Sequence, residues 1–184
     1  MINTIFSFDR ELLIKINQTG KISYDAFWLI ITNAWNWIPF FIFILWINFY
    51  FFPKKIAWRI FFYTLGVLLI TILITNTIKE VVARPRPLNT PELIPYLRII
   101  LSQDGYSFFS GHTSNSFAIC TFLYLVFRRR MKFAFWVFLW AIPYAYSRMY
   151  LAVHFPTDII IGFLVGITTA TIGYYIFKKS YSIE

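Results

Sequence analysis

The sequence has little charge, few acidic residues and almost no cysteine. Only 14% of its 184 residues are charged and 59% are hydrophobic, which gives a mean hydropathy of +0.63. The hydrophobic fraction and the mean hydropathy lie well above those of soluble domains and the charged fraction lies below, so the composition indicates a multi-pass membrane protein. The single cysteine, Cys120, excludes an internal disulfide and a cysteine-rich metal site. We expect it to be a small buried side chain.

The shortage of acids leaves 17 basic residues against 8 acidic ones, a formal net charge of +9. Such a surplus can indicate a nucleic-acid partner, an anionic lipid surface or membrane topology. The basic residues gather in short turns between apolar segments, and Lys and Arg accumulate in the cytoplasmic loops of membrane proteins. The positive net charge is therefore explained by membrane topology, and no nucleic-acid partner is needed to account for it.

The apolar runs predict an all-α fold, a transmembrane helical bundle of five to six membrane helices. A spanning helix needs about 20 residues. We expect spans at 26–52, 56–78, 109–127, 133–146 with its flanking residues, and 156–177. Proline removes a backbone donor, so the first span should kink near Pro39 and the fourth near Pro143. We find no repeat or soluble domain, and residues 1–184 are expected to form one membrane-embedded domain.

Two further segments are predicted outside the spans. Residues 1–22 contain apolar and charged residues interleaved at helical spacing, which is typical of an amphipathic helix lying in the membrane interface. The charges at Asp9, Arg10 and Glu11 argue against a cleavable signal peptide. Residues 79–111 form the one long polar connection, in which four prolines break regular structure and 92–102 is expected to make a short surface helix.

The chain has only two histidines, and both lie at the edges of apolar runs. A lone histidine in such a place is usually structural. Charged groups beside hydrocarbon are expensive, however, and are rarely kept without a use. The cluster of Arg148, His154 and Asp158 between two apolar segments is therefore a site hypothesis, and His112 belongs to it if the chain brings the two histidines together.

Alternating passes through the bilayer predict that they meet. If the second span ends at Lys79 and the third begins near Ser110, both ends face the same side, and the fourth span returns there at Arg148. The residues delivered to this face are Lys79, Arg86, Ser110, His112, Arg148, His154 and Asp158. The opposite face receives Lys54, Lys55, Arg59, Arg128, Arg129, Arg130, Lys132, Lys178 and Lys179. The basic face should be cytoplasmic and the site extracytoplasmic.

The residue types at this face suit a tetrahedral oxyanion. Ser110, Gly111 and His112 begin a helix, where free backbone N–H groups attract anions and glycine permits close approach. Lys79, Arg86 and Arg148 add three cations, and arginine binds phosphate oxygens in pairs. Phosphate is the obvious ligand. Three cations and backbone dipoles can offset its developing charge, so neither a metal ion nor another cofactor is expected.

Two histidines beside one phosphate predict phosphoryl transfer. One ring can attack phosphorus while the other protonates the departing oxygen. Asp158, four residues after His154, is placed to orient that ring and stabilise its charged form, as the aspartate of a catalytic triad does. His112 has no carboxylate close by in the sequence and is the better candidate for the general acid.

These residues resemble the three-part signature of the type 2 phosphatidic acid phosphatase superfamily. The first part, lysine, six residues and Arg-Pro, is Lys79 with Arg86-Pro87; the second, usually Pro-Ser-Gly-His, is Phe109-Ser110-Gly111-His112; the third is Ser147-Arg148, His154 and Asp158 at full spacing. Phe109 replaces the usual proline. The resemblance implies that His154 is the nucleophile, His112 the general acid and Asp158 the orienting group, and that Lys79, Arg86, Ser110, Gly111 and Arg148 bind phosphate. It also implies metal-independent hydrolysis of a lipid phosphate or isoprenoid pyrophosphate.

Other interpretations remain open at this stage. An anion transporter or channel would also gather cations at helix ends, and a serine intramembrane protease would use Ser110 with a histidine. Arg84 either solvates its loop or contacts a lipid headgroup, and Tyr144, Tyr146 and Tyr150 are expected in an interfacial aromatic belt. The candidate substrates are undecaprenyl pyrophosphate, phosphatidylglycerophosphate and the phosphate of lipid A, in a bacterial inner membrane. The sequence leaves the oligomeric state undecided.

Overall fold

The computed structural model describes residues 2–180, and these form helices and turns without a strand. The helices are α1 (Ile2–Gln18), α2 (Ile22–Thr32), α3 (Ile38–Phe51), α4 (Lys54–Val82), α5 (Gly111–Phe127), α6 (Phe138–Tyr150) and α7 (Pro156–Ser180). Four short 3-10 helices join them: η1 (Ala34–Trp37), η2 (Pro87–Asn89), η3 (Ile94–Tyr96) and η4 (Ala134–Val137). The predicted all-α class is confirmed.

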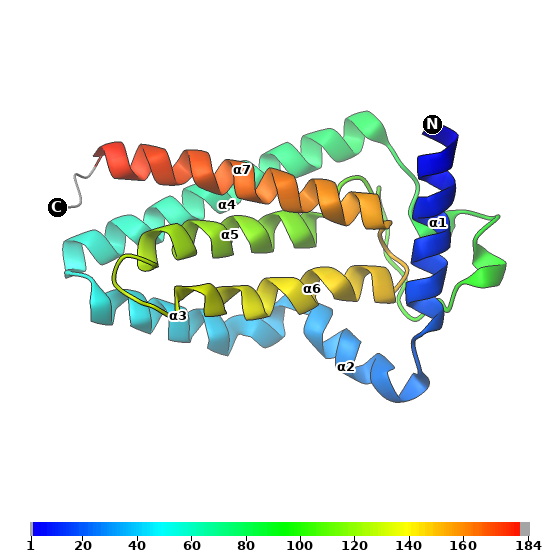
Figure 1. Ribbon diagram of the computed structural model, residues 1–184, viewed down its shortest axis with the longest axis horizontal. Helices are drawn as coiled ribbons and strands as arrows, with labels where there is room; N and C mark the ends of the chain where they lie inside the picture. The colour runs from blue at the N-terminus through cyan, green and yellow to red at the C-terminus, as the bar shows by residue number, and fades with distance from the viewer. Residues whose placement is uncertain (1, 181–184) are drawn as a thin grey trace.

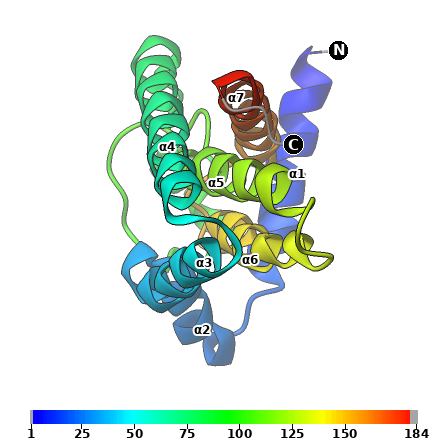
Figure 2. The same ribbon diagram turned by 90° about the vertical axis from the view of Figure 1, so that its left-hand side faces the viewer.

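Helices α3 to α7 run side by side along the long axis of the molecule (Figure 1), with α5 at the centre when the bundle is viewed from its end (Figure 2). Eleven of the 17 residues of α5 are buried, because α4, α6 and α7 all pack against it. Helix α1 lies across one end of the bundle, roughly perpendicular to the other helices (Figure 1). The start of α5, which carries the predicted phosphate-binding residues, is therefore enclosed by its neighbours.

Two glycines bring α7 close to α5. A Cβ atom added at Gly162 would lie 2.8 Å from the carbonyl oxygen of Ser110, and one added at Gly166 would lie 2.5 Å from that of Ser114. Glycines four residues apart on one helix face allow membrane helices to approach closely. This contact fixes the start of α7, with Asp158, beside the start of α5: the Ser110 N–H donates to the carbonyl oxygen of Asp158 at 3.1 Å.

Three segments are long and apolar enough to cross a membrane: Ala34–Phe51, Lys54–Asn89 and Pro156–Ser180. Helices α5 and α6, with 17 and 13 residues, are shorter than the about 20 residues that a span needs. The predicted bundle of membrane helices is thus present, but length and composition support three spans and do not establish five to six.

The first predicted span, 26–52, is interrupted at a different place from the one expected. The chain breaks at η1, before Pro39, and Pro39 lies in the first turn of α3, where proline is tolerated. Asn33 and Asn36 stabilise the break: the Asn33 side chain accepts from the N–H of Trp35, and Asn36 donates to the carbonyl oxygen of Ile30. The prediction of a kink at Pro39 was therefore wrong by a few residues, because side-chain capping by asparagine ends α2 first.

The long connection also differs from the prediction in two ways. Helix α4 continues three residues beyond Lys79 and ends at Ala83, which adopts a left-handed conformation with φ of 48°. Residues 92–102 contain only the short helix η3, with Pro95 inside it, and not the expected surface helix. A proline cannot donate the backbone hydrogen bond that a longer helix would require.

The two ends of the bundle carry different residues. The start of α4, the turn between α5 and α6 and the end of α7 lie together at the end far from α1 (Figure 1), and they hold the basic residues of the turns.

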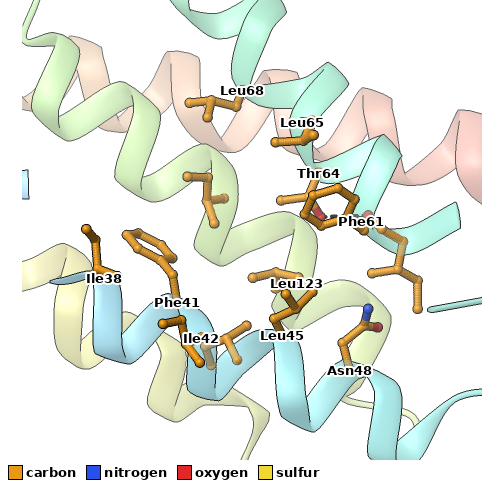
Figure 3. Close-up of a pocket in the computed structure, with 13 residues that line it drawn as sticks. Ile38, Phe41, Ile42, Leu45, Asn48, Phe61, Thr64, Leu65, Leu68 and Leu123 are labelled. Atoms are coloured by element: carbon orange, nitrogen blue, oxygen red, sulfur yellow. Dashed lines mark hydrogen bonds between the residues drawn. The ribbon is translucent and has the colours of Figure 1, made fainter. Parts of the chain in front are cut away.

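An apolar groove of about 370 Å³ runs between α3 and α4 over α5 (Figure 3). Its polar lining residues, Asn48 and Thr64, bond to backbone carbonyls. The groove has no charged lining residue, so it does not suit an anion.

Candidate active site

A cavity of about 230 Å³ lies at the end of the bundle covered by α1, and both histidine side chains line it. We call it the histidine pocket. Its lining residues are Lys79, Glu80, Arg86, Gln103, Asp104, Gly105, Tyr106, Gly111, His112 and His154. Residues from the end of α4, the long connection, the start of α5 and the α6–α7 turn thus meet around one space large enough for a phosphate group.

His154 lies in the turn between α6 and α7, and its ring is 1% exposed. Its Nε2 atom is 3.2 Å from Nη1 of Arg86, and its Nδ1 atom is 3.4 Å from Oδ2 of Asp158. A guanidinium only donates hydrogen bonds, so Nε2 must accept and the neutral ring carries its proton on Nδ1. The lone pair of Nε2 is therefore directed towards the cationic side of the site.

The surroundings of His154 favour the neutral ring. Burial lowers the pKa of His154 well below its usual range, and the positive charges of Arg148, Arg86 and Lys79 lower the pKa further. A histidine with a lowered pKa stays unprotonated as the pH falls through the value at which an exposed ring takes up a proton. At neutral pH the Nε2 atom is therefore unprotonated, as a nucleophile requires.

Asp158 occupies the first turn of α7 and is fully buried. Its Oδ1 accepts from Nη1 of Arg84 at 2.7 Å, and its Oδ2 accepts from the N–H of Phe155 at 3.0 Å. The 3.4 Å separation between Oδ2 and Nδ1 of the neutral His154 ring is too long for a good hydrogen bond, and the contact becomes an ion pair when the ring is charged. Nδ1 makes no hydrogen bond to another group in the described part of the chain. Asp158 is thus held beside the ring at the distance from which it can orient Nδ1–H.

The start of α5 forms another wall of the site. Ser110 is its N-cap: the side-chain oxygen accepts from the N–H of Thr113 at 3.4 Å and from its hydroxyl at 3.0 Å. A Cβ atom added at Gly111 would meet only Thr75, at an ordinary contact distance of 3.4 Å. The ring of His112 stacks on Tyr144 with 4.9 Å between centroids. The helix N-terminus is therefore accessible to an anion from the pocket.

Two of the three predicted cations line the histidine pocket. Arg86 donates from Nε to the carbonyl oxygen of Asp104 and from Nη1 to that of Val153. Lys79 donates from Nζ to the carbonyl oxygen of Tyr106 at 2.5 Å. Backbone carbonyls thus anchor both cations without neutralising them, which leaves their charge available to a bound anion.

Arg148, the third cation, faces a different space. It is 1% exposed and lines a second pocket of about 500 Å³ together with Leu29, Thr32, Asn33, Ala34, Trp35, Leu101, Gln103 and His112. Its guanidinium donates to the Thr32 hydroxyl and to the Gln103 side chain, and its buried Nε has no partner among the described residues. His112 and Gln103 line both pockets, so the two spaces adjoin at these side chains.

Arg84 and Asp9 are parts of the site that sequence reasoning missed. Arg84 neither solvates its loop nor faces a lipid, because its guanidinium bridges Asp158 and Asp9, each at 2.7 Å. Asp9 comes from α1, and 75 residues separate it from Arg84. The one sequence signal is the spacing of Asp9, Leu13 and Asn17, four residues apart, which places all three on one helix face.

The predicted aromatic belt was wrong for the tyrosines at the end of α6. Tyr144 and Tyr150 are 6% and 3% exposed, and Tyr146 packs its ring 4.9 Å from Trp28. Tyr144 stacks on His112, and the Tyr150 hydroxyl donates to Asp25 at 2.6 Å. Tyr144 thus packs against α5, and Tyr146 and Tyr150 pack against Trp28 of α2, so these side chains lie against protein and not in a belt at the membrane surface.

Fold and site together define the class of protein. It is a membrane-embedded helical bundle in which two histidines, an aspartate and several cations converge at one end, and among residues 2–180 no three His, Cys, Asp or Glu side chains form a metal-binding group. The chain belongs to the PAP2 superfamily, whose family model matches residues 60–182.

Two curated relatives are similar over nearly the whole chain. A lipid A 4'-phosphatase of Porphyromonas gingivalis is 32% identical over 183 residues, which are 95% of this chain and 73% of the relative. A lipid A 4'-phosphatase of Bacteroides thetaiotaomicron is 29% identical over 187 residues, with coverage of 97% and 81%. The similarity therefore includes the N-terminal region as well as the part matched by the family model.

Two solved structures share the fold. A PAP2-type phosphatidylglycerolphosphate phosphatase from Bacillus subtilis superposes with a TM-score of 0.78 at 19% identity and covers 99% of this chain and 90% of its own. LpxE of Aquifex aeolicus gives a TM-score of 0.64 at 24% identity, with coverage of 90% and 93%. At these identities the likeness concerns the arrangement of the helices.

Proposed function

We propose that this protein is an integral-membrane lipid phosphatase that hydrolyses a phosphomonoester or pyrophosphate through a phosphohistidine intermediate. The observation that carries the proposal is the histidine pocket, where a neutral His154 presents Nε2 beside Arg86 while His112 lines the same cavity. Membership of the PAP2 superfamily and the two phosphatase relatives support the same reaction type. A transporter would need the cations but not two histidines with a buried aspartate.

The first half-reaction transfers the phosphoryl group to His154. The Nε2 lone pair attacks phosphorus, and the bond from phosphorus to the leaving oxygen breaks with its electron pair on that oxygen. The negative charge of the bound phosphate group offsets the neighbouring cations and favours a protonated His112. This ring gives its proton to the oxygen, so the leaving group departs as a neutral alcohol or a protonated phosphate. The ring of His154 becomes positively charged, and the Asp158 carboxylate beside Nδ1 stabilises it.

The second half-reaction returns the enzyme to its starting state. Neutral His112 accepts a proton from water, the water oxygen attacks phosphorus, and the bond to Nε2 breaks with its electron pair on nitrogen. Inorganic phosphate leaves, and both histidines regain their initial protonation. Lys79, Arg86 and the first N–H groups of α5 offset the phosphoryl charge throughout, in the way that preformed donors stabilise a transition state.

In the proposed reaction Arg148 also binds the phosphate group, and for this it exchanges one of its hydrogen-bond acceptors. In the structure its guanidinium is bound to the Gln103 amide oxygen and the Thr32 hydroxyl. A phosphate oxygen is a stronger acceptor than an amide oxygen for a guanidinium. We infer that a bound phosphate replaces Gln103 as the acceptor for Arg148. Arg148 is close to the histidine pocket because its partner Gln103 lines both pockets.

The second pocket lies where the leaving group of the proposed reaction would be bound. It adjoins the histidine pocket at His112, the proposed acid, and therefore lies on the side where the leaving oxygen must depart. Its lining combines the apolar side chains Leu29, Ala34, Trp35 and Leu101 with the polar side chains Thr32, Asn33 and Gln103, so it suits a leaving group that has both apolar and polar parts. We propose lipid A phosphate as the first candidate substrate, which agrees with the names of the two curated relatives.

A panel of lipids tests this function. Purified protein should release inorganic phosphate from lipid A faster than from undecaprenyl pyrophosphate or phosphatidylglycerophosphate, and excess EDTA should leave the rate unchanged because the proposed chemistry uses only side chains and backbone dipoles. Phosphate release is measured in detergent micelles at equal substrate fractions. Release from none of the three lipids would contradict the phosphatase proposal, and a faster rate on undecaprenyl pyrophosphate would contradict the substrate assignment alone.

We place the site on the extracytoplasmic face of a bacterial inner membrane, with the whole chain acting as one domain. The support is the distribution of charge, since the basic turns lie at the end of the bundle far from the site (Figure 1). A cysteine introduced at Arg129, in the turn between α5 and α6, should be protected in intact cells from a membrane-impermeant thiol reagent. Labelling of that cysteine from outside would reverse the orientation.

A further inference from the structure

One face of α1 is buried against the end of the bundle that holds the active site (Figure 1). Asp9, Leu13 and Asn17, four residues apart, are at most 1% exposed. Leu13 packs in a cluster with Phe155, the residue after His154. Asn17 holds the backbone of Arg98 and Tyr150 by three hydrogen bonds. A helix that only rests in the membrane interface would bury apolar residues, so the buried Asp9 needs a separate explanation.

Asp9 is bound on both sides by groups of the active site. Its Oδ2 lies 2.7 Å from Nη2 of Arg84 and accepts from the Thr157 hydroxyl at 2.7 Å, while its Oδ1 accepts from the Thr157 N–H at 2.8 Å. Arg84 Nη1 then donates to Asp158 Oδ1 at 2.7 Å and to the Thr157 hydroxyl at 2.9 Å. The guanidinium carbon lies 3.8 Å from the centre of the Phe155 ring. A continuous set of hydrogen bonds therefore joins α1 to the proposed orienting carboxylate.

The hydrogen bonds decide which oxygen of Asp158 faces the histidine. Arg84 occupies Oδ1, so Oδ2 is left for the Phe155 N–H and for Nδ1 of His154. Without Arg84, the Phe155 N–H alone would fix the carboxylate, and Oδ1 would lose the partner that holds it away from the histidine. Because Arg84 is itself fixed by Asp9 and stacked on Phe155, its position depends on α1 remaining docked.

The charges of this set also match the proposed reaction. Arg84 alone would neutralise the buried carboxylate of Asp158 and weaken its effect on the histidine. Asp9 adds a second negative charge, so the three side chains together carry one net negative charge next to His154. A buried charge stabilises an opposite charge that forms close to it. In the proposed mechanism that opposite charge forms on the His154 ring when it takes up the phosphoryl group.

We propose that Asp9 and Arg84 are positioning residues for the phosphatase reaction, through which α1 holds Asp158 in the orientation that stabilises phosphorylated His154. This inference rests on the proposed function. It makes the N-terminal helix part of the catalytic apparatus, although no side chain among its residues 7–18, the ones whose burial is described, lines the histidine pocket.

A double-mutant cycle tests the inference on the panel lipid that the wild-type protein hydrolyses fastest. Asp9→Asn removes the charge and keeps the shape, and it should lower kcat about 10- to 100-fold with KM changed less than about threefold, because a misplaced catalytic group costs rate more than binding. In an Asp158→Asn background the same change should lower kcat less than about threefold, since the group that Asp9 positions is already lost. Asp9→Glu should recover part of the lost rate.

Asp25→Asn is the matched control, because it removes a carboxylate from another 2.7 Å ion pair, which joins α2 to Arg98 of the long connection and does not include Asp158. It should shift the melting temperature of the protein but leave kcat within about twofold. If Asp9→Asn fails to fold, Thr157→Val, which removes only the hydroxyl that binds Asp9 and Arg84, takes its place in the cycle.

The outcomes separate the two proposals. If Asp9→Asn leaves kcat unchanged, or lowers it by the same factor with and without Asp158, the positioning role is wrong while the phosphatase function stands. If the wild-type protein hydrolyses no lipid of the panel, both proposals fail together. A loss of kcat that disappears in the Asp158→Asn background supports the inference.

Discussion

Replacing His154 by glutamine should lower kcat for phosphate release at least about 10⁴-fold, because the proposed nucleophile is lost and only binding and electrostatic stabilisation remain. Glutamine has a similar volume and leaves no large cavity at a position that is 1% exposed. The melting temperature should therefore fall much less than the rate. The measurement is phosphate release from lipid A under saturating conditions, together with thermal unfolding of the same preparation.

The control for this loss is a binding measurement on the same variant. Lys79, Arg86 and the start of α5 are unchanged in it, so inorganic phosphate should still protect the protein against thermal unfolding. A variant that retains more than about 1% of the wild-type kcat would contradict the assignment of His154 as nucleophile. A variant that also loses its protection by phosphate would show that the ring holds the pocket together.

Replacing His112 by glutamine should have an effect that depends on the leaving group. A lipid alcohol leaves poorly without a proton, so the rate constant of phosphoryl transfer from lipid A should fall about 10²- to 10⁴-fold, the usual contribution of a general acid. p-Nitrophenolate leaves as a stable anion, so the rate constant of phosphoryl transfer from p-nitrophenyl phosphate should fall less than about tenfold. The rates are measured as phosphoryl transfer in a single turnover, because His112 also acts in the second half-reaction.

Tyr144 provides the matched control for His112. Its ring stacks on His112, and Tyr144→Phe keeps the stacking surface while removing only the hydroxyl. This variant should lower both rates by the same small factor. If the His112 variant loses equal activity on lipid A and on p-nitrophenyl phosphate, the ring does not protonate the leaving group and its role is to bind phosphate.

The convergence of the two histidines could be predicted because it depends only on the order of helices along the chain. Each pass through the bilayer reverses the direction of the chain, so Lys79, His112 and His154 must lie at one end whatever the lateral arrangement. The histidine pocket indeed takes its lining from these three places. The all-α class could be predicted for the same reason, since only helices satisfy the backbone of such apolar segments in lipid.

The contacts within that end could not be predicted, because the direction of a pass says nothing about which helices are neighbours. Arg84 was left between two surface roles, since its partner Asp9 lies in a segment separated from it by the whole of α2, α3 and α4. Tyr144 was expected to face the membrane interface, and only the packing of α6 against α5, η1 and α3 shows that it is buried.

Local capping explains the remaining differences in the fold. Pro39 was expected to kink one long helix, but Asn33 caps a short 3-10 helix first and separates α2 from α3. The number of membrane spans depends on such breaks. The break divides the first predicted span into α2, which is too short to cross a membrane, and α3, which reaches 18 residues only together with η1. A pattern of apolar residues does not reveal whether an asparagine side chain will bond to its own backbone.

The measurement that tests the central claim most directly is the location of the phosphoryl group during turnover. Wild-type protein mixed with its lipid substrate and quenched in alkali, in which phosphohistidine survives, is digested and sequenced by mass spectrometry. The mechanism predicts phosphate on the peptide that contains His154, and none on the peptide that contains His112. Phosphate on Ser110, or the absence of any phosphorylated peptide while phosphate is released, would contradict it.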